Sequence, residues 1–312
     1  TLYSPDGWVI LYVHVDDILI LSSTHALRTW LKDKVMTKYP CTDKGELKYY
    51  VGVQFERDYA KGTTLMHQKK FTEDLLHRFG MQDCTPTLTP MIPGTRLTSD
   101  DCPETPDLER GERYRSMCGG ATYLVTQTRA DVGFVHSELS RFQHNPGQAH
   151  MDAMIYFYRY LKGTTDLGLL YRKSTDGFTL RAIGSDVAKP TNGFPTKRNG
   201  FDLNTYGDSD WGANPDNSRS TLGWQCFLGS CLISWKSKCQ KTVAMSSSEA
   251  EYMAASNLCK EIIYLWMFLA QLGHKQYKPT VIQEDNNTCI AMTLNPVAHE
   301  RSKHICMHRN YI

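Results

Sequence analysis

Several features that would assign a sequence to a known class at once are missing from this chain. Its ten cysteines include no CxxC pair and no zinc-finger spacing, so the sequence offers no structural zinc site. Its apolar runs are short, as at 262–269 (IIYLWMFL), and none is long enough to span a bilayer. No secretory signal opens the chain. These absences predict an intracellular protein with reduced cysteines.

A strong net charge is also missing. The 35 Lys and Arg residues against 33 Asp and Glu give a net charge of +2, which does not by itself indicate nucleic-acid binding, although a balanced chain can still contain a basic groove. A length of 312 residues with 41% hydrophobic and 22% charged residues is typical of a globular protein with two or three domains. The chain starts without Met and almost directly in a strand pattern, so we expect a fragment.

Strand patterns and then helix patterns fill the first half of the chain. Strands are expected at 8–15 and 18–21. A helix is expected at 71–79, where apolar residues recur every fourth position, and Gly80 is suited to end it. The other expected elements are a strand at 47–55, a turn near 61–62, a strand at 64–67, a loop at 84–107, and helices at about 112–126, 130–143 and 148–162.

The second half predicts an α/β unit after a polar segment at 184–204 that is broken by Gly and Pro. No internal repeat is visible. The expected elements, in the order βββαβα, are strands at 205–211, 221–228 and 231–236, a long helix at 247–272, a strand at 280–285 and a short helix after Asn286.

Two adjacent aspartates, Asp16 and Asp17, interrupt the apolar run at 12–21 (YVHVDDILIL). Two carboxylates in such a run are costly to bury without a partner. A hairpin turn, which favours Asp, explains them structurally, and a metal ion explains them chemically. The interpretations are compatible, because a hairpin tip can present one carboxylate to a metal while the flanking strands hold it in place.

Three acids of the second half lie where a sheet and a helix can meet. Asp208 is in the first expected strand, Asp285 ends the later strand, and Glu251 is near the start of the long helix. Glu249 instead completes a capping box with Ser246. Because Glu251 begins the apolar stripe of its helix, we expect it to face the sheet.

Three convergent carboxylates suit Mg²⁺, which prefers hard oxygen ligands. Two such ions about 4 Å apart can activate a nucleophile and stabilise the leaving oxygen in phosphodiester chemistry. For any single acid, an exposed strand end or a helix cap is the commoner explanation. The occurrence of all three in this order favours a metal site.

Several long motifs in a fixed order carry a resemblance to a known family. They are VHVDDILI, GELKYYVGVQF, HRFGM, TRADVGFVHSELSRF, RYLKGTTDLGLLY, YGDSDWGANPDNSRSTLGW, ISWKSKCQKTVAMSSSEAEYMAA, EDNNTCIAM and RSKHI. Along nearly its whole length the sequence resembles the reverse transcriptase–ribonuclease H part of the Pol polyprotein of copia-type LTR retrotransposons.

The resemblance implies a mixed α+β and α/β fold in four parts. These are a partial reverse-transcriptase palm at 1–68, thumb and connection helices at 69–175, a linker at 176–204, and a C-terminally truncated ribonuclease H-like mixed sheet with helices at 205–312. Residues 47–55 correspond to the region that supports the primer strand.

The resemblance also implies roles for the five acids. Asp16 and Asp17 match polymerase carboxylates that bind Mg²⁺, or Mn²⁺, at the primer terminus. Asp208, Glu251 and Asp285 match the first three ribonuclease H acids, which are catalytic metal ligands.

The implied reactions are nucleotide addition to a primer and hydrolysis of RNA within an RNA–DNA hybrid, which requires recognition of 2′-hydroxyls. The implied partners are an RNA template, a DNA primer, the hybrid and the rest of the Pol polyprotein, with no membrane. The implied location is the cytoplasm, in a virus-like particle, and the nucleus. A further acid of each site is expected outside the 312 residues, so we expect the isolated chain to be inactive as a polymerase and weak or inactive as a nuclease.

Three departures from the family pattern leave a second hypothesis open. His14 stands where the family has Tyr, Cys306 stands where Asp follows KHI, and the segment at 184–204 is longer than the usual link. A non-catalytic nucleic-acid-binding remnant of a decayed element would also show such changes.

Three other sets of residues have two interpretations each. His304, Cys306 and His308 have metal-ligand spacing but are expected to be surface residues of a terminal helix. Three tryptophans are expected to pack against the core or the sheet rather than to stack on bases: Trp211, Trp224 and Trp235. Five basic residues either contact phosphates or belong to a solvated linker: Arg172, Lys173, Lys189, Lys197 and Arg198.

Overall fold

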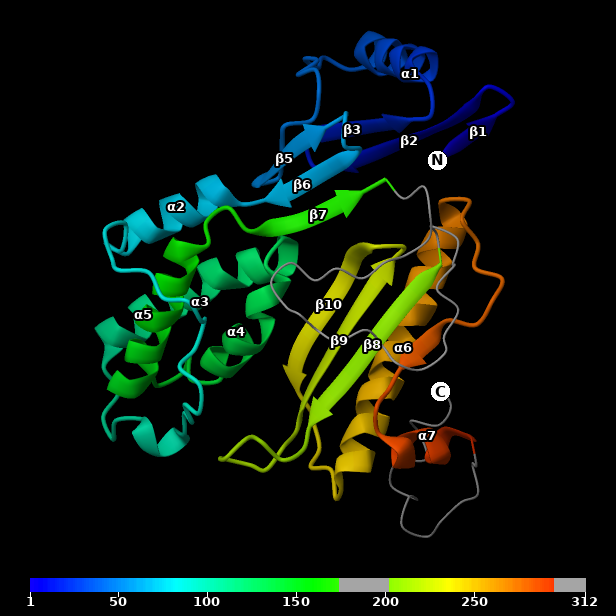
Figure 1. Ribbon diagram of the computed structural model, residues 1–312. Helices are drawn as coiled ribbons and strands as arrows, with labels where there is room; N and C mark the ends of the chain where they lie inside the picture. Colours follow the sequence, from blue (N-terminus) through cyan, green and yellow to red (C-terminus); the bar gives the residue numbers. More distant parts are fainter. Residues whose placement is uncertain (174–201, 295–312) are drawn as a thin grey trace.

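The computed structural model describes residues 1–173 and 202–294. Its strands form three sheets, with the orders β1-β2-β3, β4-β5-β6-β7 and β10-β9-β8-β11. Helices α2 to α5 form a separate group beside the second and third sheets, and α6 lies against the third sheet (Figure 1). Mixed helices and sheets of this kind make the chain an α+β protein.

The first sheet contains the predicted hairpin. Strands β2 (Gly7–His14) and β3 (Asp17–Ser22) pair antiparallel, with His14 opposite Asp17, and β1 (Leu2–Ser4) adds to the outer edge of β2. The turn residues are Val15 and Asp16, and Val15 has a φ of 51°. The two strands predicted around the aspartates are therefore confirmed.

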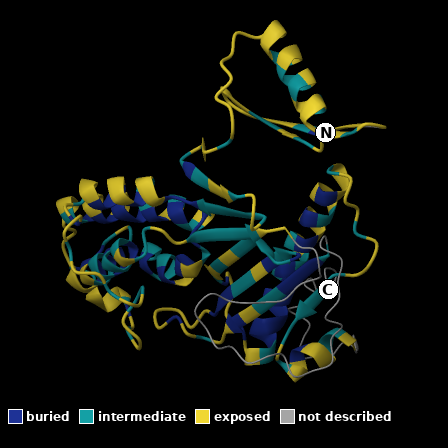
Figure 2. Ribbon diagram, turned by 45° about the horizontal axis from the view of Figure 1, so that its top comes forward, coloured by how far each residue is buried: buried dark blue, intermediate teal, exposed yellow. Residues whose placement is uncertain are grey.

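Helix α1 (His25–Lys38) was not predicted from the sequence, and none of its residues is buried. Among the described side chains of residues 1–52, Val9 alone is buried. Figure 2 shows this part of the chain as largely exposed, whereas the buried residues gather in the helices and the third sheet. A helix without a buried face has no strong apolar period, which explains why the pattern did not reveal it.

The single strand predicted at 47–55 is wrong, because a tight turn divides it. The turn joins β4 (Tyr49–Tyr50) to β5 (Val53–Asp58), and Val51 and Gly52 have φ values of 43° and 70°. Tyr123 donates a hydrogen bond from its hydroxyl to the carbonyl oxygen of Val51. A helix residue distant in sequence thus stabilises the turn, and β-branched Val51 hid it from a local pattern.

Strand β6 (Thr63–His67) follows the predicted turn, in which Gly62 has a φ of 61°. An unpredicted strand, β7 (Gly168–Arg172), pairs with β6, with Met66 opposite Leu169. The range expected to hold thumb and connection helices therefore also contributes a strand, and this strand extends the sheet formed by residues 49–67.

The helical group has the predicted order. Its helices are α2 (Lys69–Arg78), α3 (Leu108–Gln127), α4 (Gly133–Ser140) and α5 (Gln148–Gly163). Gly80, with a φ of 69°, ends the predicted helix as expected. The expected helix at 130–143 is a 3-10 turn followed by α4. The expected loop at 84–107 contains one 3-10 turn, Ser99–Asp101.

The core of the helical group is the largest in the described chain. Its fully buried side chains include Met117, Leu124, Leu139, Phe157 and Leu161. Two buried tyrosines place their hydroxyls on helix carbonyls: Tyr114 on Leu139 at 2.7 Å and Tyr158 on Met117 at 2.8 Å. These bonds satisfy hydroxyls that would otherwise be costly to bury.

The third sheet confirms the predicted order βββαβα. Its elements are β8 (Leu203–Asp210), β9 (Thr221–Leu228), β10 (Cys231–Cys239), α6 (Ser247–Gln271), β11 (Val281–Gln283) and α7 (Asn287–Leu294). Strand β11 runs parallel to β8, and the other pairs are antiparallel. Strand β8 begins at Leu203, inside the segment expected as a linker up to 204; positions 176–201 of that segment lie outside the described residues.

Direct contacts join the helical group to the third sheet. Trp235 of β10 donates a hydrogen bond from Nε1 to the carbonyl oxygen of Val125 at 2.8 Å. Arg141 pairs with Asp216 at 2.5 Å and donates to the Asn214 side chain at 2.8 Å. Within the described residues, no helix is long and apolar enough to cross a membrane.

Candidate functional site

The third sheet and α6 bring Asp208, Glu251 and Asp285 together. Strands β8 and β11 pair in parallel, with Gln283 opposite Tyr206. Asp208 lies two residues after Tyr206, and Asp285 lies two residues after Gln283. Glu251 reaches the same place from the first turns of α6, the helix that packs on β8. One carboxylate oxygen from each acid lies within 4.8 Å of the others.

The start of α6 explains why Glu251 and not Glu249 joins this group. Ser246 is the N-cap, and its side chain accepts a hydrogen bond from the backbone of Glu249 at 3.2 Å. The Glu249 carboxylate in turn accepts from the backbone N–H of Met245 at 2.9 Å. Glu249 therefore stabilises the helix start, although its carboxylate accepts from Met245, one residue before the N-cap, and not from Ser246 as a capping box requires. Glu251 is left to face the sheet.

Glu251 is the buried member of the group. It is only 6% exposed, and its Oε2 atom has no hydrogen-bond partner, whereas Asp208 and Asp285 are exposed. Asp208 accepts a hydrogen bond from the backbone N–H of Ser209 at 2.8 Å. A buried carboxylate oxygen without a donor is costly, and a cation between the three acids would satisfy it.

The electrostatics of the site also favour a cation between the three acids. Burial, as the largest cause, and the neighbouring acids Glu284, Asp208 and Asp285 together raise the pKa of Glu251 to about 8. Burial also raises the pKa of Glu284, against the effect of the Asn286 backbone N–H, which lowers it. Without a cation, the group therefore holds a proton on Glu251 at neutral pH.

The donor set fits Mg²⁺ or Mn²⁺. Carboxylate oxygens are the ligands that these ions prefer, and Mg²⁺–oxygen distances of about 2.1 Å allow two ligands of one ion to be at most about 4.2 Å apart. The spread of the three oxygens, at most 4.8 Å, needs only a small side-chain adjustment to meet that limit, or none if two ions about 4 Å apart share the ligands.

Asp16 and Asp17 lie elsewhere, at the exposed tip of the β2–β3 hairpin. Among the described residues, neither belongs to a group of three possible metal ligands. The ring of Tyr12, on β2, lies 6.1 Å from the ring of Tyr50, so the hairpin contacts the turn at residues 49–53. The hairpin tip presents two carboxylates to solvent, beside the sheet formed by β4, β5, β6 and β7.

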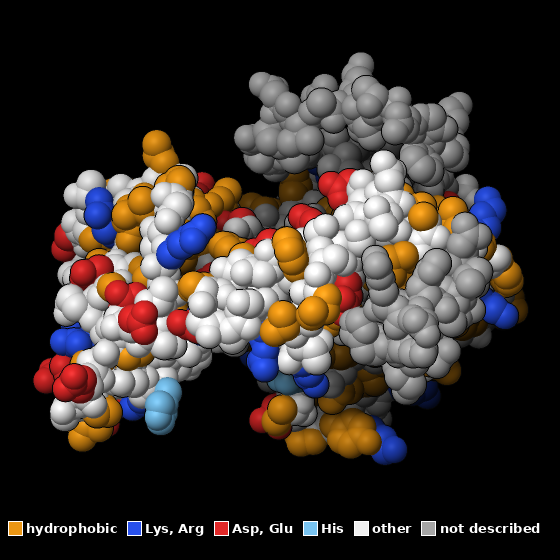
Figure 3. Space-filling model, turned by 90° about the horizontal axis from the view of Figure 1, so that it is seen from below, with side chains coloured by type: hydrophobic (Ala, Val, Ile, Leu, Met, Phe, Trp, Pro, Cys, Tyr) orange, Lys and Arg blue, Asp and Glu red, His pale blue; other side chains and the backbone are white. Residues whose placement is uncertain are grey.

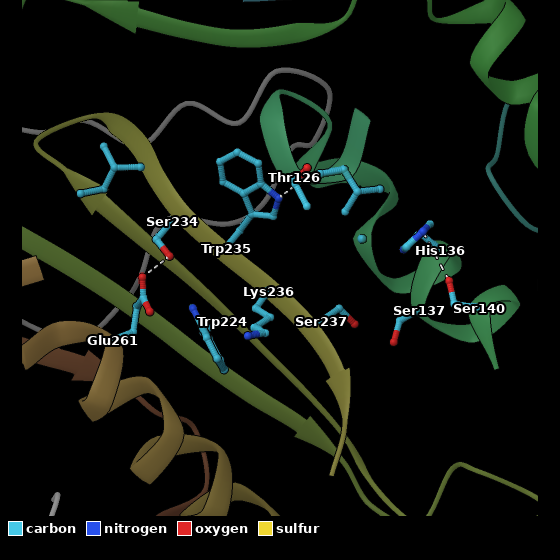
Figure 4. A pocket seen from close by; sticks show the side chains of 13 residues that line it. Thr126, His136, Ser137, Ser140, Trp224, Ser234, Trp235, Lys236, Ser237 and Glu261 are labelled. Atoms are coloured by element: carbon cyan, nitrogen blue, oxygen red, sulfur yellow. Dashed lines mark hydrogen bonds between the residues drawn. The ribbon is translucent and has the colours of Figure 1, made fainter. Parts of the chain in front are cut away.

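A cavity separates α4 from β9 and β10. It has a volume of about 570 Å³ and is lined by His136, Trp224, Trp235, Lys236 and Glu261, among others. Figure 4 shows Trp224, Trp235 and Lys236 on the strands and His136 on the helix side, with Glu261 hydrogen-bonded to Ser234 and His136 to Ser140. A second cavity, of about 430 Å³, shares Trp224 and Lys236 with the first and extends to Asp208.

The tryptophans differ in their burial. Trp224 and Trp235 are half-buried, and the ammonium group of Lys236 lies 5.4 Å from the centroid of a Trp224 ring. Trp211 donates from Nε1 to the Ala244 carbonyl at 3.0 Å, but it is 57% exposed. The expectation of packing thus holds for the two residues of β9 and β10 and is wrong for Trp211.

The basic residues form no single patch on the face of the described chain that Figure 3 draws. Arg172 and Lys173 are exposed at the end of β7. On the face drawn in Figure 3, the Lys and Arg side chains of described residues are scattered among acidic and apolar ones. Six residues considered above lie outside the described ranges: Lys189, Lys197, Arg198, His304, Cys306 and His308.

Comparisons with known proteins agree with the resemblance. The family described as reverse transcriptase (RNA-dependent DNA polymerase) matches residues 2–93. The Retrovirus-related Pol polyprotein from transposon TNT 1-94 of Nicotiana tabacum is 32% identical over 99% of this chain and 22% of its own length. The Pol polyprotein from transposon RE2 of Arabidopsis thaliana is 32% identical over 97% of this chain and 19% of its own length.

This chain belongs to the copia-type retrotransposon Pol family. By family it is of reverse-transcriptase type, and it spans about a fifth of the length of these Pol relatives. An uncharacterized mitochondrial protein of Arabidopsis thaliana is 30% identical over 81% of this chain and 93% of its own length. No solved structure matches the chain.

Sequence reasoning missed one acid of this Pol family member, Glu284. It is half-buried next to Asp285 in the sequence, and its charge raises the pKa of Glu251, as do Asp208 and Asp285. Adjacent residues of an extended strand point to opposite faces, so the strand pattern gave no reason to place both acids at one site. The chain leaves the strand at Gln283, and this ends the alternation before Glu284.

Proposed function

We propose that residues 203–294 are the main part of a ribonuclease H-like domain that hydrolyses the RNA strand of an RNA–DNA hybrid with divalent metal ions. The supporting observation is the convergence of Asp208, Glu251 and Asp285, with a buried oxygen of Glu251 that lacks a donor. The parallel pairing of β11 with β8 brings Asp208 and Asp285 to the same end of the two strands, and Glu251 reaches them from α6.

Each acid has a distinct part in this proposal. Bound Mg²⁺ or Mn²⁺ would supply an activated water and stabilise the leaving oxygen. Asp208 and Asp285 are exposed and so can bind metal on the side open to substrate, whereas Glu251 closes the buried side. The cavity that reaches Asp208 gives a strand of nucleic acid a route to the same residue.

We further propose that residues 1–68 belong to a polymerase palm and residues 69–175 to its thumb and connection. In this proposal Asp16 and Asp17 bind metal at the primer terminus, together with a further acid that is not among their described neighbours. The turn at Val51 and Gly52 supports the primer strand. The partners would be an RNA template, a DNA primer and the remainder of the polyprotein.

Metal binding is the direct test of the nuclease site. Titration with Mn²⁺, followed by electron paramagnetic resonance, should show binding to the purified chain. Asp208→Asn should weaken that binding at least tenfold, because a ligand is lost. Asp152→Asn is the control, since Asp152 lies on α5 and only accepts a hydrogen bond from Gln148. Equal binding by all three proteins would contradict the proposed centre.

A labelled RNA–DNA hybrid then separates two functions. Mn²⁺-dependent cleavage of the RNA strand that Asp208→Asn abolishes would support the nuclease. Salt-dependent binding of the hybrid without cleavage would instead favour a non-catalytic nucleic-acid-binding domain. Duplex DNA serves as the competitor that tests recognition of the 2′-hydroxyls.

A further inference from the structure

Gln240 directly follows β10 and lies where the third sheet meets the start of α6, the helix that covers this sheet (Figure 1). It is only 3% exposed. Its backbone N–H donates a hydrogen bond to the carbonyl oxygen of Ser220 at 2.7 Å, which holds the end of β10 beside the start of β9. The buried side chain of Gln240 therefore starts from a fixed backbone position.

The side-chain amide of Gln240 joins β8 to the start of α6. Its nitrogen, Nε2, donates to the Ser209 hydroxyl oxygen at 3.2 Å and to the Ala250 carbonyl oxygen at 2.9 Å. A backbone carbonyl can only accept, so the nitrogen of the amide and not its oxygen faces Ala250. Both partners are buried, so the two hydrogen bonds form inside the protein, where water does not compete for them.

The two partners of Gln240 are the chain neighbours of two of the three convergent acids. Ser209 follows Asp208 on β8, and Ala250 precedes Glu251 on α6. Neither hydrogen bond uses a carboxylate, so both acids keep their oxygens for a metal ion. The ligand oxygens lie within 4.8 Å of one another, and two ligands of one Mg²⁺ ion can be at most about 4.2 Å apart. A small change in the separation of β8 from α6 therefore changes how well an ion is held.

Stability alone is a poor explanation for this amide. Oε1 of Gln240 is buried and has no hydrogen-bond partner, and a buried acceptor without a donor destabilises the folded chain. An apolar side chain of similar length would lose the two bonds of Nε2 but would also remove this unpaired oxygen. What the amide provides, and an apolar residue does not, is a link between the two segments that carry Asp208 and Glu251.

We propose that Gln240 is a positioning residue of the metal centre, which sets the separation of β8 from the start of α6 and thereby the spacing of the Asp208 and Glu251 carboxylates. This inference rests on the proposed metal-dependent nuclease. Gln240 acts through the two chain segments that it joins and not as a ligand of the ion.

Gln240→Met tests this role, because methionine has a similar length and volume but cannot donate a hydrogen bond. Gln68→Met is the matched control. Gln68, which precedes α2 in the helical group, is 1% exposed; its side chain accepts one hydrogen bond, from the Thr128 hydroxyl at 2.9 Å, and its Nε2 is also buried without a partner. The measurements are thermal unfolding without metal, the Mn²⁺ affinity, and the electron paramagnetic resonance line shape of bound Mn²⁺, which reports the symmetry of its ligands.

We expect Gln240→Met to bind Mn²⁺ about 10- to 100-fold more weakly than the wild type, the range typical for loss of a group that orients metal ligands. The line shape of the Mn²⁺ that remains bound should be broader. Gln68→Met should match the wild type in both measurements, although the two Met variants should unfold at similar temperatures without metal, because each loses buried amide contacts.

Ser209→Ala is a second variant, which removes only the bond between Gln240 and β8. It should cause part of the loss of Mn²⁺ affinity. The double variant with Gln240→Met should bind Mn²⁺ about as weakly as Gln240→Met alone, because both substitutions break the same link. Fully additive losses would contradict a shared link between Ser209 and Gln240.

Three other results would also overturn the inference. Mn²⁺ binding by Gln240→Met within about twofold of the wild type, while Asp208→Asn is impaired, would refute the positioning role and leave the proposed function standing. An unfolding temperature below that of Gln68→Met, with unchanged Mn²⁺ affinity and line shape, would make Gln240 a packing residue only. Absence of Mn²⁺ binding by the wild type would remove the metal centre, and with it the proposed function.

Discussion

Neutralising Glu251 should change how the stability of this protein depends on pH. The pKa of Glu251 rises from 4.5 to about 8 in the folded chain, first through burial and then through Glu284, Asp208 and Asp285. Since the folded state holds the proton more tightly than the unfolded state does, this residue's contribution to stability is fully present below about pH 4.5. It is lost as the pH rises through about 8.

The structure sets the size of this effect. At about 1.36 kcal/mol per pKa unit, the pKa shift of Glu251 from 4.5 to about 8 corresponds to a loss of stability of at most about 5 kcal/mol between low and high pH. Solvent reaches the two exposed aspartates and weakens their effect on the pKa of Glu251. We therefore expect the free energy of unfolding to change by about 2–4 kcal/mol. Glu251→Gln cannot titrate. In the absence of metal it should therefore be more stable than the wild type at pH 8 by this amount and similar to it near pH 4.5.

Urea unfolding in the presence of a chelator, at several pH values between 4.5 and 8.5, measures the difference. Addition of Mg²⁺ at pH 8 should stabilise the wild type and leave Glu251→Gln nearly unchanged, because the metal replaces the proton only where the carboxylate is present. Parallel pH profiles for the two proteins would refute the reasoning, since Glu251 would then have the same proton affinity in both states.

Three further substitutions test the packing of the β4–β5 turn and of the helical group. Gly52→Ala should cost about 1–3 kcal/mol, because Gly52 has a φ of 70° and an added Cβ would meet the Tyr123 hydroxyl; chemical denaturation checks this. Tyr114→Phe should cost about 1–2 kcal/mol through the lost bond to Leu139, with an unchanged denaturant m-value. Arg129→Ala should cost about 3–5 kcal/mol and lower the midpoint of thermal unfolding, because Arg129 is buried and pairs with Asp131 at 2.8 Å. A loss below 1 kcal/mol on Arg129→Ala would contradict the last prediction.

Local patterns were enough for the elements whose signals are contained in a few residues. The Asp16–Asp17 hairpin, the end of a helix at Gly80 and the βββαβα order all follow from alternation, helical spacing and turn residues. At the start of α6, the capping pattern assigned Glu249 to the helix start, and the apolar stripe assigned Glu251 to the side that faces the sheet.

Other features depend on residues far away along the chain. The turn at Val51 and Gly52 is held by Tyr123, and β7 becomes a strand beside β6, about a hundred positions earlier. Helix α1 has no buried residue, so its apolar period was too weak to detect. For the turn and for β7, the deciding contact lies outside any window of sequence that a local pattern can describe.

By itself the sequence determined which acids are present, which of them begins the buried stripe of α6, and the order of elements that carries them. The tertiary structure alone decided that Asp208, Glu251 and Asp285 each bring a carboxylate oxygen within 4.8 Å of the others. The reason is physical: these acids are far apart in the sequence, and only the parallel pairing of β11 with β8 and the packing of α6 on β8 bring them together.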